Sequence, residues 1–407
     1  MANPVITHAP TVKILVEGID GEPDWAFFEW MAMANGGYVM RARIHDPYLN
    51  FLDKMSKILL QKARNGPLIC KFTIKWIDGE QTDEMEAWVT DVAAAGSQLY
   101  NQTEIIAIDP PSWALNAGKS SGEVFKGKVS TVIQDVCKKY QINGAPQVSV
   151  TTTKDDENNQ WWMMRQDPKT FIQMLLDWSS SAVPKKTCWV TNCKNKQMEI
   201  KEQADLPNID LGTFQVNVRS FSAASDIHSV SLESDTLLAL WQTQMHTQGL
   251  SAVSGKYLDN KVAKDSVVVK DENTSNKINS ACTAQESFKK PTKEWSTSML
   301  AIPEHNAGDV GMKYQDYIDG RPRNMYISQL NLVHRICVRT QGNCKVKDPL
   351  GLDGSTCNLT WKNEKGENYW LGGKWIVYGF HHQVSREMFV TDLYCRRGDF
   401  DEAAERR

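Results

Sequence analysis

The chain has 407 residues, of which 41% are hydrophobic and 23% are charged, and its formal net charge is −3 with a pI of ≈ 6.3. This length exceeds one ordinary core and predicts roughly two to four packed units. The composition excludes wholesale disorder, and the charge argues against a general basic surface for nucleic acid, although DNA could still slide through a smooth passage.

The sequence shows neither a secretion signal nor the cysteine pattern of a disulfide-bonded protein. Residues 1–9 lack a basic start followed by an apolar run, and no segment has the roughly 20 apolar residues that cross a bilayer. The 9 cysteines are an odd number and are widely scattered. We therefore expect free thiols, synthesis in the cytoplasm and no stable membrane insertion.

Alternating hydrophobic and polar residues predict β-strands in the N-terminal part. The clearest strand is 70–76, in which Cys70, Phe72, Ile74 and Trp76 are expected to face the core. The Asp-Gly pair that follows is typical of a turn between antiparallel strands. Further strands are expected at 11–19, 38–44, 84–97 and 103–111.

Two helices are predicted to interrupt these strands. The first is 23–37, which would end at its Asn-Gly-Gly sequence. The second is 46–66, with Asp46 as the N-cap, Pro47 at the first helical position and Gly66 beyond the end. We expect the second helix to cover an open end of a barrel.

The hydrophobic period changes between residues 118 and 207, which indicates an inserted α/β unit. One amphipathic helix follows the extended segment that begins at Gly122, and a second begins at Asp167 and Pro168 after a polar turn at 155–160. The apolar positions of the two helices are Val129, Val132, Ile133, Val136, Cys137 and Tyr140, and then Phe171, Ile172, Leu175 and Leu176.

A second β-rich portion is predicted from Leu211 onward. Residues 251–293 are polar and rich in Ser, Lys and Asn, so we expect a long excursion there instead of core. The strand pattern resumes near Met325, and a hairpin from Trp375 to Arg396 closes the fold before a charged tail.

The sequence predicts no catalytic, cofactor-binding or metal-binding residue. The sequence 118–121 resembles part of a phosphate loop, but Trp113 stands where that loop needs glycine. Cys188 and Cys193 are compatible with zinc, with a disulfide in a mature particle or with free thiols. Acidic pairs such as Asp155–Asp156 and Asp83–Glu84 fall in predicted turns and do not indicate a hydrolase.

His381 and His382 are adjacent within the closing hairpin. Adjacent strand residues point to opposite faces, so the two rings do not readily bind one metal. We expect one packed and one solvated imidazole.

Three segments together resemble the central hub family of contractile-tail baseplates, which includes the late-control D proteins, the T-even hub and the N-terminal half of the type VI secretion spike protein. They are 124–140, 163–182 and 373–397, and His382, Phe389, Thr391 and Leu393 fall at matching places in the family's terminal hairpin. Residues 251–293 have no clear counterpart, and the helix from Pro168 ends in Trp178 and a serine run instead of the common acidic-Gly ending.

The resemblance implies a mixed β and α+β fold with two tube-type antiparallel β-barrels and an inserted small α/β domain. The expected division is 1–115 for the first barrel with covering helices, 116–208 for the insert, 209–400 for the second barrel with its excursion at 251–293, and 401–407 for the charged tail.

The resemblance also implies a structural and non-enzymatic role in the tail baseplate of a virion, after assembly in the host cytoplasm. A homotrimer would present six barrels and would join a hexameric tail tube above to a separate trimeric spike protein below, with baseplate wedge proteins around it and DNA only passing through the channel. Alternatives are the equivalent hub of a tailocin or type VI-like device, a tail-associated cell-wall hydrolase and a carbohydrate-binding β module.

Overall fold

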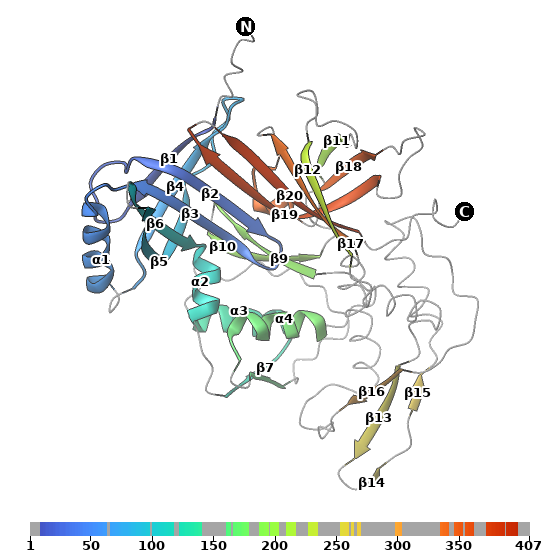
Figure 1. Cartoon of the computed structure of the whole chain (residues 1–407). Coiled ribbons are helices and arrows are strands. Elements are labelled where there is room, and N and C mark those ends of the chain that lie inside the picture. The colour runs from blue at the N-terminus through green and yellow to red at the C-terminus, as the bar shows by residue number, and fades with distance from the viewer. Residues whose placement is uncertain are drawn as a thin grey trace.

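A computed structural model provides the architecture of the chain. The described residues are 9–62, 66–97, 100–117, 122–140, 160–163, 166–178, 187–194, 196–202, 209–216, 227–234, 253–259, 262–263, 267–269, 298–302, 334–341, 346–352, 355–361, 372–386 and 388–397. Most strands of this part belong to one 12-stranded sheet, which spans the upper part of Figure 1.

The first half of that sheet comes from the N-terminal part of the chain. Its strands lie in the order β1-β4-β5-β6-β3-β2, and all neighbours are antiparallel. Helix α1 lies at the outer end of this half. The elements are β1 (Thr11–Val16), β2 (Trp25–Met33), β3 (Gly37–His45), α1 (Asn50–Lys62), β4 (Ile69–Lys75), β5 (Met85–Ser97) and β6 (Tyr100–Ile108).

A smaller helical unit follows and lies below the sheet in Figure 1. It has its own hydrophobic core, formed by buried residues between Ala114 and Ile200. Strands β9 and β10 pair with each other and lie between this core and the large sheet. The elements are α2 (Pro110–Ala117), β7 (Glu123–Lys126), α3 (Val129–Lys139), β8 (Gln160–Met163), α4 (Pro168–Trp178), β9 (Thr187–Asn192) and β10 (Gln197–Glu202).

The C-terminal part supplies the second half of the sheet. Its order is β11-β18-β19-β20-β17-β12, and β19 also pairs with β2 of the first half. The elements are β11 (Asp210–Val216), β12 (Ile227–Ser234), β17 (His334–Gln341), the 3-10 helix η2 (Pro349–Gly351), β18 (Thr356–Trp361), β19 (Gly373–Ser385) and β20 (Phe389–Arg397).

The fold class predicted from the sequence is confirmed at the level of mixed β and α+β structure, since antiparallel sheet dominates the described residues beside four α-helices. The predicted strands at 11–19, 38–44, 70–76, 84–97 and 103–111 are confirmed, as is the closing hairpin. The four residues predicted to face the core from 70–76 are all buried.

The helix predicted at 23–37 is wrong, because this segment contains strand β2. Phe28, Trp30 and Ala32 are buried, whereas the residues between them are partly exposed. Both faces of the strand carry large apolar residues. The sequence therefore lacks the alternation of apolar and polar residues that would indicate a strand.

The second predicted helix exists, but it begins later than expected. The Asp46 carboxylate accepts hydrogen bonds from the backbone N–H groups of Phe51 and Leu52, at 3.2 and 2.9 Å, so it caps α1 from several residues away. The chain turns in between through Leu49, whose φ is 56°. Pro47 therefore precedes the helix instead of opening it.

The two helices predicted in the insert are confirmed as α3 and α4. The five apolar residues predicted from Val129 to Cys137 are buried, and so are Phe171, Ile172 and Leu175. The N–H of Thr170 donates to the Asp167 carboxylate at 2.8 Å, which is the predicted cap of α4.

Other elements were not predicted. Helix α2 begins at Pro110, where the sequence indicated only the end of a strand. Within the predicted excursion 251–293, the strands β13 (Val253–Asp259), β14 (Val262–Ala263) and β15 (Val267–Val269) form a separate sheet with β16 (Ser298–Ile302). The predictions for 118–121, 155–159, 325–333 and 401–407 lie outside the described residues.

None of the described helices has the length and apolar character that crossing a bilayer would need.

Asp109 fixes the junction between the sheet and α2. It is fully buried and accepts hydrogen bonds from the N–H groups of Tyr38 and Ser112 and from the Thr191 hydroxyl, at 2.8, 3.0 and 2.8 Å. Burial raises the pKa of this carboxyl. Gly37 lies directly against it, with a φ of +72°.

Substitution Gly37→Ala should therefore lower the free energy of unfolding strongly. A Cβ there would stand 2.1 Å from both Asp109 Oδ2 and Ser112 Oγ, so the Asp109 hydrogen bonds would be disrupted. We expect a loss of about 3 kcal/mol or more in denaturant titrations. Gly21→Ala is the control, because Gly21 has a φ of +83° and no atom near its Cβ position, and should cost only about 1 kcal/mol. Equal losses in the two variants would contradict this role of Asp109.

Candidate functional site

The two halves of the large sheet are two copies of one strand arrangement, here called the first module (β1 to β6) and the second module (β11, β12 and β17 to β20). Numbered in chain order within each module, the strands lie in the order 1-4-5-6-3-2 in both. One pairing differs, because β1 and β4 are antiparallel whereas β11 and β18 are parallel.

The irregularities of the two modules also coincide. The pairing of β2 with β3 shifts between Trp25 and Phe27, and that of β12 with β17 shifts at the corresponding place, between Ile227 and Ser229. A second shift lies between Val89 and Asp91 in β5, and between Val377 and Gly379 in β19. Bulges are specific backbone features, so their coincidence aligns the modules residue by residue.

Side chains at aligned positions support this correspondence. The Arg43 guanidinium donates to Glu104 at 2.9 Å, and Arg339 donates to Asp392 at 2.7 and 2.8 Å from the aligned positions. Both carboxylates follow a buried threonine, Thr103 in the first module and Thr391 in the second. Buried Cys70 and Cys357 are likewise aligned.

The candidate functional site is the seam, which we define as the antiparallel pairing of β2 with β19. It runs from Met33 opposite Gly379 to Phe27 opposite Ser385. The close approach of the strands at one end favours glycine at position 379, because a Cβ there would lie 3.1 Å from the carbonyl oxygen of Ala32. The seam thus makes one continuous sheet from the two modules.

His382 organises the core side of the seam. Its Nε2–H donates to the Val346 carbonyl at 3.0 Å, so its Nδ1 accepts from the Thr391 hydroxyl at 2.8 Å. Burial lowers the pKa of His382 to about 3, and the ring is neutral at physiological pH. Aromatic rings from both modules surround the imidazole, namely Trp30, Trp76, Phe380 and Phe389.

The segment that His382 holds also contacts the first module. Lys347, next to Val346, forms ion pairs with Asp78 and with Glu80, the latter at 2.6 Å. Asp78 and Glu80 belong to the turn between β4 and β5. The buried histidine therefore helps to fix the second module against a loop of the first.

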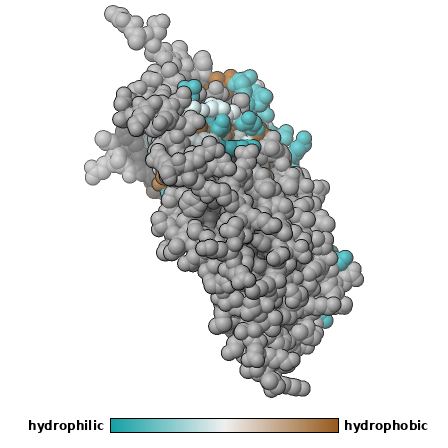
Figure 2. All heavy atoms as spheres, turned by 90° about the vertical axis from the view of Figure 1, so that its right-hand side faces the viewer, coloured by the Kyte–Doolittle hydropathy of each residue, from teal (hydrophilic) through white to brown (hydrophobic). Residues whose placement is uncertain are grey.

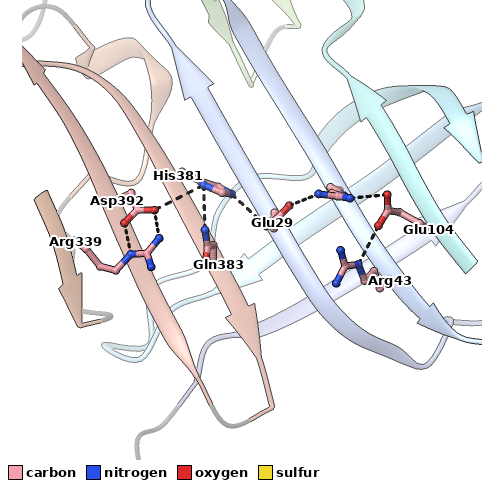
Figure 3. A network of polar contacts seen from close by, with 8 residues as sticks. Glu29, Arg43, Glu104, Arg339, His381, Gln383 and Asp392 are labelled. Carbon is pink, nitrogen blue, oxygen red and sulfur yellow. Dashed lines mark hydrogen bonds and ion pairs between the residues drawn. The ribbon is translucent and has the colours of Figure 1, made fainter. Parts of the chain in front are cut away.

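Charged residues line the opposite face of the seam, as Figure 3 shows. The chain of contacts runs across six neighbouring strands, from Arg339 on β17 to Glu104 on β6. Arg41 lies 2.7 Å from Glu104 and 3.5 Å from Glu29, and His381 lies 3.6 Å from Glu29 and 3.9 Å from Asp392. Ionisable side chains from both modules thus contact one another across the seam.

The partners of Glu104 and Glu29 in this contact network hold these two carboxylates in their ionised form. Burial would raise the pKa of Glu104, but the hydrogen bonds from Arg41 and Arg43 outweigh it, and the pKa is lowered. Interaction with His381 is the largest cause of the lowered pKa of Glu29; burial opposes it, and Arg41 and Arg43 add to it.

The expectation for the adjacent histidines is half right. They point to opposite faces, and His382 is packed as predicted, but His381 is not solvated, since its side chain is only 16% exposed within the charged chain. The sequence did not lead us to predict that the arginines and carboxylates shown in Figure 3 form one contact network. The available signal was the placement of Arg41 and Arg43 on the outward face of their strand, but their partners depend on strand order.

The cysteines show no ligand cluster in the described residues. Cys193 is a buried free thiol, and burial raises its pKa well above the usual value; the Cys188 side chain lies outside the described part. Burial also raises the pKa of Cys70 and of Cys137 to about 12. In the described part of the chain, no three His, Cys, Asp or Glu residues are grouped so that they could hold a metal ion.

Comparison with known proteins gives structural neighbours only. No protein-family model and no curated protein sequence matches the chain. The tail protein from Neisseria meningitidis MC58 aligns over 97% of this chain and 98% of its own, with 11% identity and a TM-score of 0.57. The 43 kDa tail protein of prophage MuSo2 from Shewanella oneidensis aligns over 95% and 97%, with 10% identity and a TM-score of 0.53.

A third neighbour, the E. coli c3393 protein, is described as a component of the type VI secretion system; it is 9% identical, with a TM-score of 0.49 over 96% of this chain and 79% of its own. The first two neighbours show that the chain has the fold of phage tail proteins. The resemblance predicted from the sequence is confirmed at the level of the fold.

Glu104→Gln should weaken the fold in a pH-dependent way. Because the folded-state pKa of Glu104 is lowered, its contribution is present above the unfolded value of about 4.3 and is lost as pH falls through the folded value. We expect the variant to be about 1–3 kcal/mol less stable at pH 7, and the difference from the wild type to shrink below about pH 4. Glu22→Gln, which removes an exposed ion pair with Lys13, is the control and should cost little at any pH. A pH-independent difference for Glu104→Gln would refute this assignment.

Proposed function

We propose that the chain is the structural hub of a contractile phage tail baseplate, in which three copies form a ring of six sheet modules around an axial channel. The observation that carries this proposal is the duplicated module joined edge to edge at the seam. If a module pairs with its neighbour in the same way between chains as within one, repetition of the contact closes a ring. Three-fold symmetry with two modules per chain gives six similar units.

Each module is proposed to be a tube-type barrel. Two contacts between the end strands support closure: the Trp25 indole N–H donates to the Val12 carbonyl at 2.8 Å, and β11 lies beside β12. In this proposal, 1–115 is the first barrel, 116–208 the insert and 209–400 the second barrel, with the excursion 251–293 and the tail 401–407.

The charged chain across the seam suits a channel wall. This network of charged residues lies on the face opposite the hydrophobic core. At each end of the network, an arginine pairs with a carboxylate. Cationic walls would hold passing DNA through its phosphates, whereas compensated arginines would not. The described surface on the side of β11, β12 and β18 is also mainly hydrophilic, with small hydrophobic areas (Figure 2).

The role in this proposal is mechanical and non-enzymatic. The ring would join a hexameric tail tube, or its initiator, to a trimeric spike formed by another chain, with wedge proteins around it. It would reside in the tail baseplate of the virion after assembly in the host cytoplasm. The same ring would serve a tailocin or a type VI-like device.

The purified full-length protein should assemble into trimers. Light scattering or native mass spectrometry should give about three times the 46.0 kDa of one chain at high protein concentration. Smaller particles at low concentration would reflect mass action. A protein that stays monomeric at every concentration, alone and with the tube and spike proteins encoded beside it, would overturn the hub function.

A further inference from the structure

The alignment of the two modules identifies a pair of strand edges that have no partner among the described residues. Strand β19 uses one edge twice: its first part pairs with β18 up to Ile376, and its second part pairs with β2. Its counterpart β5 is also 13 residues long and pairs with β4 up to Trp88. Beyond that point, no described strand occupies the corresponding edge of β5.

The second free edge belongs to β12. Its counterpart β2 pairs with β3 on one side and with β19 on the other, whereas β12 pairs only with β17 in the described sheet. Among the described strands, one edge of the β2 type and one edge of the β19 type are therefore left over. Unpaired edges are templates for another strand, and these two are complementary in kind.

We propose that β12 of one copy pairs antiparallel with the second half of β5 of another copy, in the register that the seam defines. This inference rests on the proposed ring and names the strands that close it. Trp30 lies opposite His382 in the seam. Counted from the shared bulges, the corresponding residues are Leu232 and Ala94, which face each other across the joint between copies. By the same alignment Glu233 lies opposite Ala93.

The exposure of these residues fits such a joint. Trp30 is fully buried, but Leu232 is 41% exposed although it occupies the aligned position. Ala93 and Ala94 on β5 are exposed as well. Pairing would cover Leu232 as β19 covers Trp30, which removes an exposed large apolar side chain from water.

The joint between copies differs chemically from the seam within a chain. Three residues make the polar contacts across the seam, namely Arg41, Glu29 and His381. Their aligned counterparts are Cys337, Ser231 and Ala93. None of these three counterparts is charged, and Glu233 on the same face pairs with Arg335 of its own chain. The joint between copies therefore lacks the counterpart of the polar contacts that cross the seam.

Paired cysteines test the register directly. In the Cys337→Ser background, which removes a nearby half-exposed thiol, Glu233→Cys with Ala93→Cys should give covalent trimers as the main species on a non-reducing denaturing gel, reversed by dithiothreitol. Each single substitution should give none. Glu233→Cys with Asp91→Cys, shifted along the same face of β5, should cross-link at least fivefold less.

The outcomes separate the two levels of the proposal. Trimers that show no cross-linking above the shifted control would overturn the assigned edges or their register while leaving the ring intact. Protein that neither trimerises nor cross-links would overturn the ring and this inference together.

Leu232→Lys tests the same edge without engineered thiols. The lysine should raise the concentration for half-maximal trimer formation at least tenfold, while the melting temperature of the monomer stays unchanged because Leu232 is already exposed. Val124→Lys on β7 is the matched control, since Val124 is 50% exposed and lies on a strand outside the large sheet, and it should assemble normally. Normal assembly of Leu232→Lys would exclude this edge as the interface.

Discussion

Backbone pairing between β2 and β19 is the interaction on which the rest of the structure depends. It joins strands from opposite ends of the chain into one sheet, and one hydrophobic cluster then runs through both modules. Without this pairing, each module would expose an edge with unpaired N–H and C=O groups, which is costly in a core and hazardous at a surface. The pairing also requires a close approach, which Gly379 permits.

Comparison of the two modules distinguishes the features that both share from the side chains that differ with position. Strand order, both bulges and the arginine–carboxylate pair occur in each module. The residues around the seam diverge, since Trp30 and His382 correspond to Leu232 and Ala94. The modules thus share a backbone arrangement but differ in the side chains at their strand edges. Such a difference is expected if similar joints must be permanent within a chain and separable between chains.

The sequence predicted the strands whose two faces differ and failed where they did not. In 70–76, buried apolar residues alternate with lysine and threonine, so the period of two is clear. In β2, aromatic and methionine side chains occupy both faces, and the pattern was mistaken for a helix. Asp109 followed by Pro110 is a local helix-start signal that was not used, whereas the burial of Asp109 could not be predicted because its partners Tyr38 and Thr191 are distant in sequence.

Part of the candidate site could be predicted from the sequence. The closing hairpin and the opposite orientation of His381 and His382 followed from strand geometry, and the resemblance marked His382 and Thr391, which are hydrogen-bonded partners. Neither approach could predict that β19 pairs with β2, because strand order depends on packing of the whole chain. The contact network of Figure 3 could therefore not be predicted from the sequence, although its arginines and carboxylates are ordinary charged residues on strands.

The two faces of the seam provide different kinds of cohesion. On one face, the neutral His382 ring lies among aromatic side chains, where burial suppresses its charge. On the other, arginines and carboxylates neutralise each other across neighbouring strands. A wall that faced DNA with unpaired arginines would bind phosphates, and one with unpaired carboxylates would repel its own neighbours. Pairing them holds the strands in register and leaves the face nearly neutral; in the proposed ring, the same contacts would therefore serve both cohesion of the sheet and smooth passage of DNA.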